Sequence, residues 1–444
     1  MLSAFACCGV GACASAWAAH IVATSNTIGQ KIQVIRLKNE NNLNSTVYNR
    51  SSGSILNATA KRRSAMNSNV EMVEDVATYV DFNELFFTPR FAADCFGLTT
   101  RRLKDIEESN NIEIRRVPRG TVTSRVYTPS DLFDLAALRR ELGHLKGLAR
   151  QVVMSTYISK GGTNKTTTAV GQAITCSLAG LRVLLVDNDP QGDTSSMLGY
   201  DPDATPEDLQ ELGIPADRIV DGHLGHLISP MLRMRSFQPK TLDEVIKKPF
   251  GENGPHLIPA DASLEDLGVA LDAANNSDMW YAKWVEDGKA GKISGCDLSQ
   301  YDVIIFDNAP AGSRLTKNSV AASDLLMSPV RMDKFSFKAI LRLHDWCAGF
   351  AREYGFAPEL VAVPTMFAKG RPRMLNNLYR LNQLFPGRVT EEKIYHSADY
   401  VNSLDDGVPL MFWKGANRDT IDNARAVHAE VLEKIRRVAA QPQE

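Results

Sequence analysis

The stretch Ser-Lys-Gly-Gly-Thr-Asn-Lys-Thr-Thr-Thr at residues 159–168 decides the fold predicted for this 444-residue chain. It lies between an apolar run, Val152 to Ile158, and a helix-compatible run, Ala169 to Ala179. A strand, a glycine-rich loop and a helix in this order bind phosphate, because backbone N–H groups and the helix dipole point at the anion. Ser159 and Asn164 stand at both glycine positions of the usual G-x-x-x-x-G-K-[ST] pattern. Asn tolerates the left-handed backbone that glycine provides.

The loop carries two lysines, Lys160 and Lys165, five residues apart. Lys165 stands where a phosphate-loop lysine contacts the β- and γ-phosphates, and the Thr166 hydroxyl follows at the position that ligates Mg²⁺. Gly161 and Gly162 let the backbone approach the phosphates without a Cβ clash. A lone lysine in such a loop is usually just solvated, so the prediction of a nucleotide site depends on further elements.

Acidic residues supply those elements, because they follow two apolar runs. Asp187 and Asp189 come after the run Arg182 to Val186, and Asp307 ends the run Val303 to Phe306. In parallel sheets the ligand crevice lies beyond the carboxyl ends of the strands. We therefore expect all three carboxylates to face the phosphates and the metal, with Asp307 in the layout of a Walker B acid. Together with the loop they predict nucleotide binding.

Composition predicts an ordinary folded protein of two or three domains, with a net charge of −2 and 44% hydrophobic residues. Seven cysteines without metal-ligand spacing favour a reduced, cytosolic protein. No long apolar run suited to crossing a membrane follows residue 25. Residues 1–65 begin with an apolar segment without Lys or Arg before Lys31 and continue as a polar stretch. We interpret them as an upstream extension from a misplaced start codon, or as disordered if they are translated.

The segment at residues 66–86 places Val70, Val73, Val76 and Val80 at helical spacing. This pattern predicts one amphipathic helix. Two alternatives stay open for its apolar face, namely pairing with its copy in a dimer and packing on its own domain.

Residues 87–149 predict a small winged helix-turn-helix domain. Thr88 caps a helix through Phe96, Gly97 ends it, and Thr99 or Thr100 caps a second helix. A β-hairpin with a turn at Pro118-Arg119-Gly120 forms the wing, and a further helix runs from Pro129 to Leu142; the order resembles the domain of MerR-type regulators. The candidate DNA-binding residues are Thr100, Arg101, Arg102 and Lys104 on the second helix, and Arg115, Arg116, Arg119 and Arg125 on the wing. The alternative is that these are solvated surface charges.

Residues 150–444 predict an α/β domain with a mostly parallel sheet, covered by helices on both faces. Continuous apolar runs alternate with helix-compatible segments, as in such sheets. The predicted strands are Val152–Ile158, Arg182–Val186, Tyr301–Phe306, Asp324–Val330 and Leu360–Pro364.

Three motifs give this domain a family resemblance. They are Lys-Gly-Gly-x-x-Lys-Thr from Lys160, Val-Asp-x-Asp-Pro-Gln-Gly from Val186, and Phe-Asp-x-Ala-Pro from Phe306. Residues 150 to about 438 thereby resemble the deviant Walker-A ATPases of the ParA/MinD group, a branch of the P-loop NTPases. Chains of this kind with an N-terminal DNA-binding domain resemble the larger plasmid-type ParA proteins. Asn164 and the loose phrase around Asp307 depart from the family pattern.

The resemblance implies a role for each matching residue. Lys160 matches the signature lysine that reaches the nucleotide of a second subunit, and Asp189 matches the acid that positions the attacking water. Lys165 completes the catalytic set, and Thr166, Asp187 and Asp307 match the metal side. The nucleotide contacts that it implies are Lys160, Gly161, Gly162, Thr163, Asn164, Lys165, Thr166 and Thr167, with Pro364, Thr365 and Met366 near the adenine.

The family further implies ATP and Mg²⁺ as cofactors, a homodimer, a ParB-type centromere-binding partner, and both operator and nonspecific DNA. It implies a cytoplasmic, nucleoid-associated partition ATPase that represses its own operon. Lys369, Arg371 and Arg373 match a basic region that binds nonspecific DNA, although a solvated face is the alternative. Two rival functions are a nucleotide-responsive transcription regulator without turnover and a MinD-like ATPase that cycles on membranes. No membrane partner is expected, because the amphipathic last helix lacks large aromatics.

Overall fold

The computed structural model describes residues 80–120, 122–205, 215–333 and 336–441, and four short strands before them. The chain divides into two compact units, residues 1–75 and 76–444. In the first unit the strands form two antiparallel pairs, β1 (His20–Thr24) with β2 (Ile32–Arg36) and β3 (Thr46–Asn49) with β4 (Ser54–Asn57). The expectation for residues 1–65 stays a prediction. Residues 66–79 of the predicted N-terminal helix lie outside the described part, and its last residues form a 3₁₀ turn, η1 (Phe82–Glu84).

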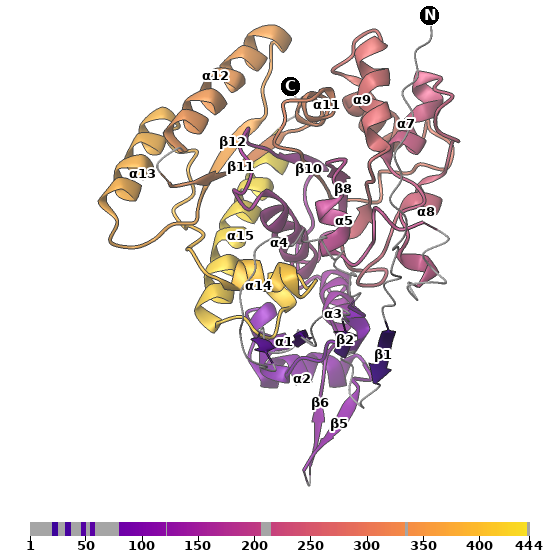
Figure 1. Ribbon diagram of the computed structural model, residues 1–444, viewed down its shortest axis with the longest axis vertical. Coiled ribbons are helices and arrows are strands. Elements are labelled where there is room, and N and C mark those ends of the chain that lie inside the picture. Colours follow the sequence, from indigo (N-terminus) through magenta and orange to yellow (C-terminus); the bar gives the residue numbers. More distant parts are fainter. Residues whose placement is uncertain are drawn as a thin grey trace, which may run out of the picture. The chain divides into compact units, whose positions relative to one another are not determined.

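A six-stranded sheet with every pairing parallel forms the centre of the second unit (Figure 1). Its order is β12-β11-β7-β10-β8-β9, so the strand before the loop lies in the middle. The strands are β7 (Val152–Thr156), β8 (Val183–Asn188), β9 (His256–Ile258), β10 (Val303–Asn308), β11 (Leu325–Arg331) and β12 (Glu359–Thr365). A parallel α/β P-loop fold is therefore confirmed, and the short strand β9 was missed because three residues give no periodicity.

Helices cover both faces of the sheet, which explains its continuous apolar strands. Alternate side chains such as Val152 and Met154 pack with α4 and α15, whereas Val153 packs with α7, α9, α10 and α11. A third cluster joins β11 and β12 to α12 and α13. The helices are α4 (Lys165–Leu178), α5 (Asp193–Met197), α7 (Leu224–Leu232), α8 (Leu242–Val245), α9 (Leu264–Ala273), α10 (Trp280–Lys289), α11 (Arg314–Ala321), α12 (Ser336–Tyr354), α13 (Pro372–Leu384), α14 (Asp399–Asp405) and α15 (Arg418–Ala439), with 3₁₀ turns η2 (Ala216–Arg218) and η3 (Leu410–Phe412).

The N-terminal part of this unit contains three helices and a hairpin. They are α1 (Pro89–Cys95), α2 (Thr100–Ser109), β5 (Arg116–Arg119), β6 (Val122–Arg125) and α3 (Pro129–Glu141). Thr88, Thr99 and Thr128 cap the three helices through their side chains. The predicted turn is wrong at Pro118 and Arg119, because both residues pair with β6 inside β5. The hairpin projects away from the sheet in Figure 1.

One hydrophobic core joins these helices to the sheet. Phe87 and Phe133 lie 5.8 Å and 5.9 Å from the ring of Phe412, and Phe250 lies 5.5 Å from the same ring. Arg140 on α3 adds a charged contact, since its Nη2 donates to a carboxylate oxygen of Asp302 at 2.9 Å. The N-terminal helices are thus packed onto the α/β part through buried aromatic rings.

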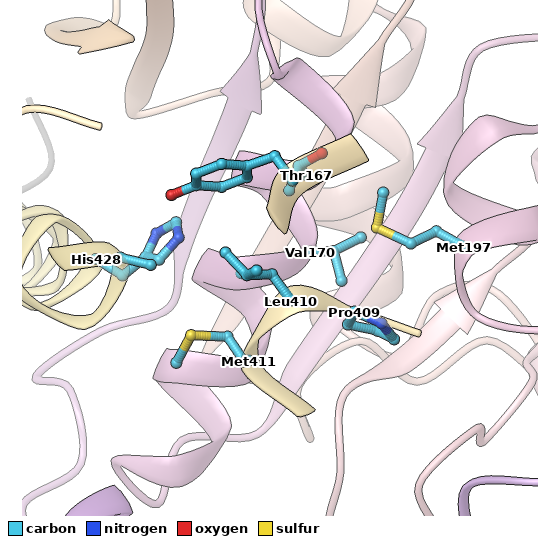
Figure 2. Close-up of a pocket in the computed structure, with 10 residues that line it drawn as sticks. Thr167, Val170, Met197, Pro409, Leu410, Met411 and His428 are labelled. Carbon is cyan, nitrogen blue, oxygen red and sulfur yellow. The ribbon is translucent and has the colours of Figure 1, made fainter. Parts of the chain in front are cut away.

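The last helix, α15, lies against α4, the helix that follows the phosphate loop. A small cavity of about 10 Å³ remains between them and η3, too small for more than one water (Figure 2). Thr167, Leu410 and His428 are among the residues that line it. The apolar side chains of α15 are buried in this packing, including Val427 and Val431. Among the described residues no helix is long and apolar enough to span a bilayer.

Candidate nucleotide site

Residues 157–164 connect β7 to α4 in a conformation suited to holding an anion. Gly162 and Asn164 both have a left-handed backbone, with φ of 64° and 65°. Asn164 is the residue before α4, so its left-handed turn aims the start of the helix toward the loop. Asn164 therefore adopts the left-handed backbone that the sequence predicts an Asn can tolerate at this position.

Lys165 is the first residue of α4 and is 8% exposed. Its Nζ donates a hydrogen bond to the backbone carbonyl of Lys160 at 3.0 Å. Burial lowers the pKa of Lys165, and the negative charges of Asp307, Asp189 and Asp193 oppose that shift. Two of the three predicted acids, Asp189 and Asp307, therefore act on the charge of Lys165, together with Asp193, which was not predicted.

Lys160 points to a different partner. Its Nζ lies 2.9 Å from Oδ1 and 3.1 Å from Oδ2 of Asp333, a residue 173 positions later in the chain. Asp333 follows β11, and β11 pairs directly with β7, so the sheet brings the two residues together. Arg331 contacts the same carboxylate through Nε at 2.9 Å.

Asp187 is fully buried, and both of its carboxylate oxygens have partners within the chain. Oδ2 accepts from the backbone N–H and the hydroxyl of Ser195, at 2.9 Å and 2.7 Å, and Oδ1 accepts from the N–H of Asp189 at 3.3 Å. Burial raises the pKa of Asp187 to about 8. This carboxylate thus joins the end of β8 to α5, and its role as a metal-side acid stays a prediction.

Asp307 at the end of β10 has a different environment. Its Oδ2 accepts from the hydroxyl of Thr194 at 2.8 Å, whereas its Oδ1 is buried and has no hydrogen-bond partner. Burial raises the pKa of Asp307 to about 6, and the hydroxyls of Thr194 and Thr166 oppose that shift. An unpartnered carboxylate oxygen beside a threonine hydroxyl is a donor set that suits Mg²⁺.

Further unpartnered polar atoms accompany it. The hydroxyls of Thr156 and Thr163 and the side-chain amide nitrogen of Asn164 are buried without a hydrogen-bond partner. Buried polar groups are usually paired, so such atoms at one loop indicate a place that takes a polar ligand. Within the described ranges no group of three or more His, Cys, Asp or Glu side chains is arranged to hold a metal. The residues fit a Mg²⁺ ion that takes its remaining ligands from phosphate and water.

The predicted adenine-side residues lie next to the loop. Thr365 ends β12, and its hydroxyl donates to the backbone carbonyl of Thr163 at 3.2 Å. Met366 has a left-handed backbone, with φ of 51°, and so redirects the chain after Pro364 and Thr365. The structure thus brings this segment to the loop from about 200 residues away in sequence.

The predicted DNA-binding side chains fall into two groups. Those on α2 are exposed, as are Arg115 and Arg116, and so are Lys369, Arg371 and Arg373 at the start of α13. Arg125 is different, because it forms an ion pair with the buried carboxylate of Glu107, which also accepts from the hydroxyl of Tyr127 at 2.6 Å. Arg125 is therefore paired within the domain, and its predicted role in DNA binding stays a prediction. The side chain of Arg119 lies outside the described part.

Sequence reasoning missed several residues of this site. Asp333, Arg331, Thr194 and Ser195 contact the loop or its acids, yet none belongs to a recognisable motif. Asp193 and Thr194 follow directly after the Asp-x-Asp-Pro-Gln-Gly phrase, so their proximity in sequence was a usable signal.

Comparison with known proteins agrees with this geometry. A family model described as an AAA domain matches residues 151–354, which include the loop, both Asp motifs and β11. The cell division protein PomZ of Myxococcus xanthus is 25% identical over 244 residues, covering 54% of this chain and 64% of PomZ. The SopA protein of Escherichia coli K12 is 28% identical over 297 residues, covering 62% of this chain and 67% of SopA. A ParA family protein of Chlamydia pneumoniae is 26% identical over 255 residues, covering 56% of this chain and 86% of that protein, so this part of the chain is similar to ParA-type ATPases.

The matched stretches span about two thirds of the length of these curated relatives. Among solved structures, the apo form of McdA from Cyanthece superposes with a TM-score of 0.50 at 18% identity, covering 64% of this chain and all of McdA. At that identity the superposition supports the fold of this part of the chain and nothing beyond it.

Proposed function

We propose that this chain is a DNA-partition ATPase that binds ATP and Mg²⁺, dimerises on ATP and hydrolyses it. The observation that carries the proposal is the loop with two lysines, in which Lys165 is surrounded by acids while Lys160 extends to the edge of the loop. A nucleotide site used within one chain needs Lys165 alone. A second lysine beside it is the feature by which the motif resembles ATPases that act as dimers.

Each residue has a stated task in this proposal. Lys165 holds the phosphates and gives up its hydrogen bond to the carbonyl of Lys160. Thr166 and the unpartnered Oδ1 of Asp307 hold the metal side. Asp189 is partly exposed, and we assign it the positioning of the attacking water. When both are bound, ATP supplies the phosphoryl group and Mg²⁺ neutralises part of the phosphate charge.

Lys160 acts on the nucleotide of a second copy, where its charge stabilises the transferring phosphate in the manner of an arginine finger. ATP hydrolysis is therefore expected to rise steeply with protein concentration. A centromere-binding partner of the ParB type is the proposed trigger for turnover. These roles come from the family resemblance and from the position of Lys160 beside its own loop.

DNA binding is proposed at two surfaces. The exposed cations Lys369, Arg371 and Arg373 suit sequence-independent phosphate contacts in the dimer. The module formed by α1, α2, the β5–β6 hairpin and α3 has the element order of a winged helix-turn-helix domain, with Thr100 and Arg101 exposed at the start of α2. We propose that this module binds the operator and represses the chain's own operon, which would give a cytoplasmic, nucleoid-associated protein.

The test is nucleotide-dependent binding to a DNA of arbitrary sequence, measured by gel shift with and without ATP. Lys165→Ala should abolish the ATP-dependent part, because the phosphates lose their main cation. The exposed Lys338→Ala on α12 serves as the matched control and should behave as wild type. ATP-dependent DNA binding that survives in Lys165→Ala would refute the switch.

A second candidate function is a transcription regulator that binds nucleotide without turnover, which the DNA-binding module favours. Phosphate release measured with DNA and partner present separates the two. Membrane cycling is disfavoured, because the apolar face of α15 is buried against α4.

A further inference from the structure

Two cations share the carboxylate of Asp333 at the edge of the loop. Lys160 contacts both oxygens, at 2.9 Å and 3.1 Å, and Nε of Arg331 contacts Oδ2 at 2.9 Å. The side chains of Lys160 and Asp333 are 25% and 27% exposed, so water screens this pair only in part. The backbone of Asp333 is also held, because its carbonyl accepts from the side-chain amide of the buried Asn377 at 2.9 Å.

Arg331 is tied to the loop independently of Lys160. Its Nη1 donates to the backbone carbonyl of Gly162 at 3.3 Å while its Nε contacts Asp333. Arg331 ends β11, and at this position the strand is paired with Thr365 of β12. When Lys160 moves, Arg331 can therefore stay where it is and keep its contact with the carboxylate.

We propose that Asp333 is a positioning residue that holds Lys160 within the separate chain, and that Arg331 is the counter-ion that remains when Lys160 crosses to the nucleotide of a second copy. The inference rests on the proposed function. Its physical reason is charge balance, because an unpaired carboxylate beside the loop would repel the phosphates. With Arg331 in place, releasing Lys160 costs one partly exposed ion pair and leaves no uncompensated charge.

The two partners of Lys160 then have opposite effects on dimerisation. Asp333→Asn frees Lys160, so the ATP-dependent dimer tightens. Breaking one partly exposed ion pair changes an equilibrium constant about 1.4- to 5-fold. A symmetric dimer contains two copies of Lys160, so the dissociation constant of the Asp333→Asn dimer should be about 2- to 30-fold lower. Arg331→Gln should weaken the ATP-dependent dimer instead, because Asp333 then loses the cation of Arg331 and holds Lys160 more strongly.

The experiment is sedimentation velocity of the full chain with a non-hydrolysable ATP analogue and Mg²⁺. Asp345→Asn, an exposed carboxylate on α12, is the matched control and should leave the dissociation constant unchanged. In a Lys160→Ala background Asp333→Asn should have no further effect, because it acts through that lysine. Binding of a fluorescent ATP analogue to the dilute monomer should be no weaker in Asp333→Asn than in wild type, which excludes a damaged nucleotide site.

Three outcomes overturn the inference. The first is a dimer that weakens or does not change in Asp333→Asn, the second is the same sign of change in Asp333→Asn and Arg331→Gln, and the third is an equal effect of Asp333→Asn with and without Lys160. Wild type that binds the analogue but stays monomeric refutes the proposed function itself, and the inference with it. Wild type that dimerises while both variants behave normally refutes the inference alone.

Discussion

Acid should destabilise this protein through His428, a buried residue of α15. Its Nδ1 lies 3.1 Å from Oε1 of Gln172 on α4, and burial lowers its pKa to about 4. A histidine whose pKa is lowered on folding binds its proton more readily in the unfolded chain. The stability that it contributes is therefore fully present above pH 6.5 and is lost as the pH falls toward 4.

The magnitude follows from the two pKa values. With an ordinary pKa of about 6.5, the pKa of His428 differs by roughly 2 to 3 units, which limits the loss to about 3 kcal/mol. At pH 5 the linkage relation gives a loss of about 2 kcal/mol relative to pH 8. Other buried groups add to the total in both directions. His223, whose pKa is also lowered to about 4, acts the same way, whereas Asp187 and Asp307, with raised pKa values, act oppositely.

The assay isolates His428 by comparing pH responses. Urea unfolding of wild type and His428→Gln is followed at pH 8 and pH 5, and the free energy of unfolding is extrapolated to water for each. The variant should lose about 2 kcal/mol less than wild type between the two pH values, whatever its stability at pH 8. If the two proteins lose the same stability within about 0.5 kcal/mol, the reasoning about His428 is refuted.

Three further outcomes are expected. Gly171→Ala should destabilise by roughly 1–3 kcal/mol in urea unfolding, because a Cβ there would lie 2.4 Å from Nε2 of His428, and stability gained instead would contradict the close packing. Arg125→Ala should lower the free energy of unfolding by about 3–5 kcal/mol, because it removes the ion-pair partner of the buried Glu107 carboxylate. The exposed Arg101→Ala should change the free energy of unfolding by no more than about 0.5 kcal/mol, and it should weaken operator binding measured by fluorescence anisotropy. Asn164→Gly should keep ATP binding, measured with a fluorescent analogue, while the β-branched Asn164→Val should reduce it because φ is 65°; equal binding by both variants would argue against that constraint.

The sequence by itself determined the strand–loop–helix unit and most of the sheet. Local signals were sufficient there, because the apolar run, the left-handed Asn164 and the start of α4 all lie within the 14 residues from Val152 to Lys165. The same holds for Thr88, Thr99 and Thr128, whose caps need only the residues that follow them. The strand β9 was too short to give a pattern.

Only the tertiary structure decided which charged side chains form ion pairs and which stay exposed. Asp333 reaches Lys160 because β11 and β7 are neighbours in the sheet, and no spacing along the chain records that adjacency. Arg125 looks like its exposed neighbours in sequence, yet the fold places it on the carboxylate of Glu107. Ion pairs form between side chains that packing brings together, whereas periodicity reports only which way one segment faces. The second lysine of the loop was therefore visible in the sequence, and the partner that holds it was not.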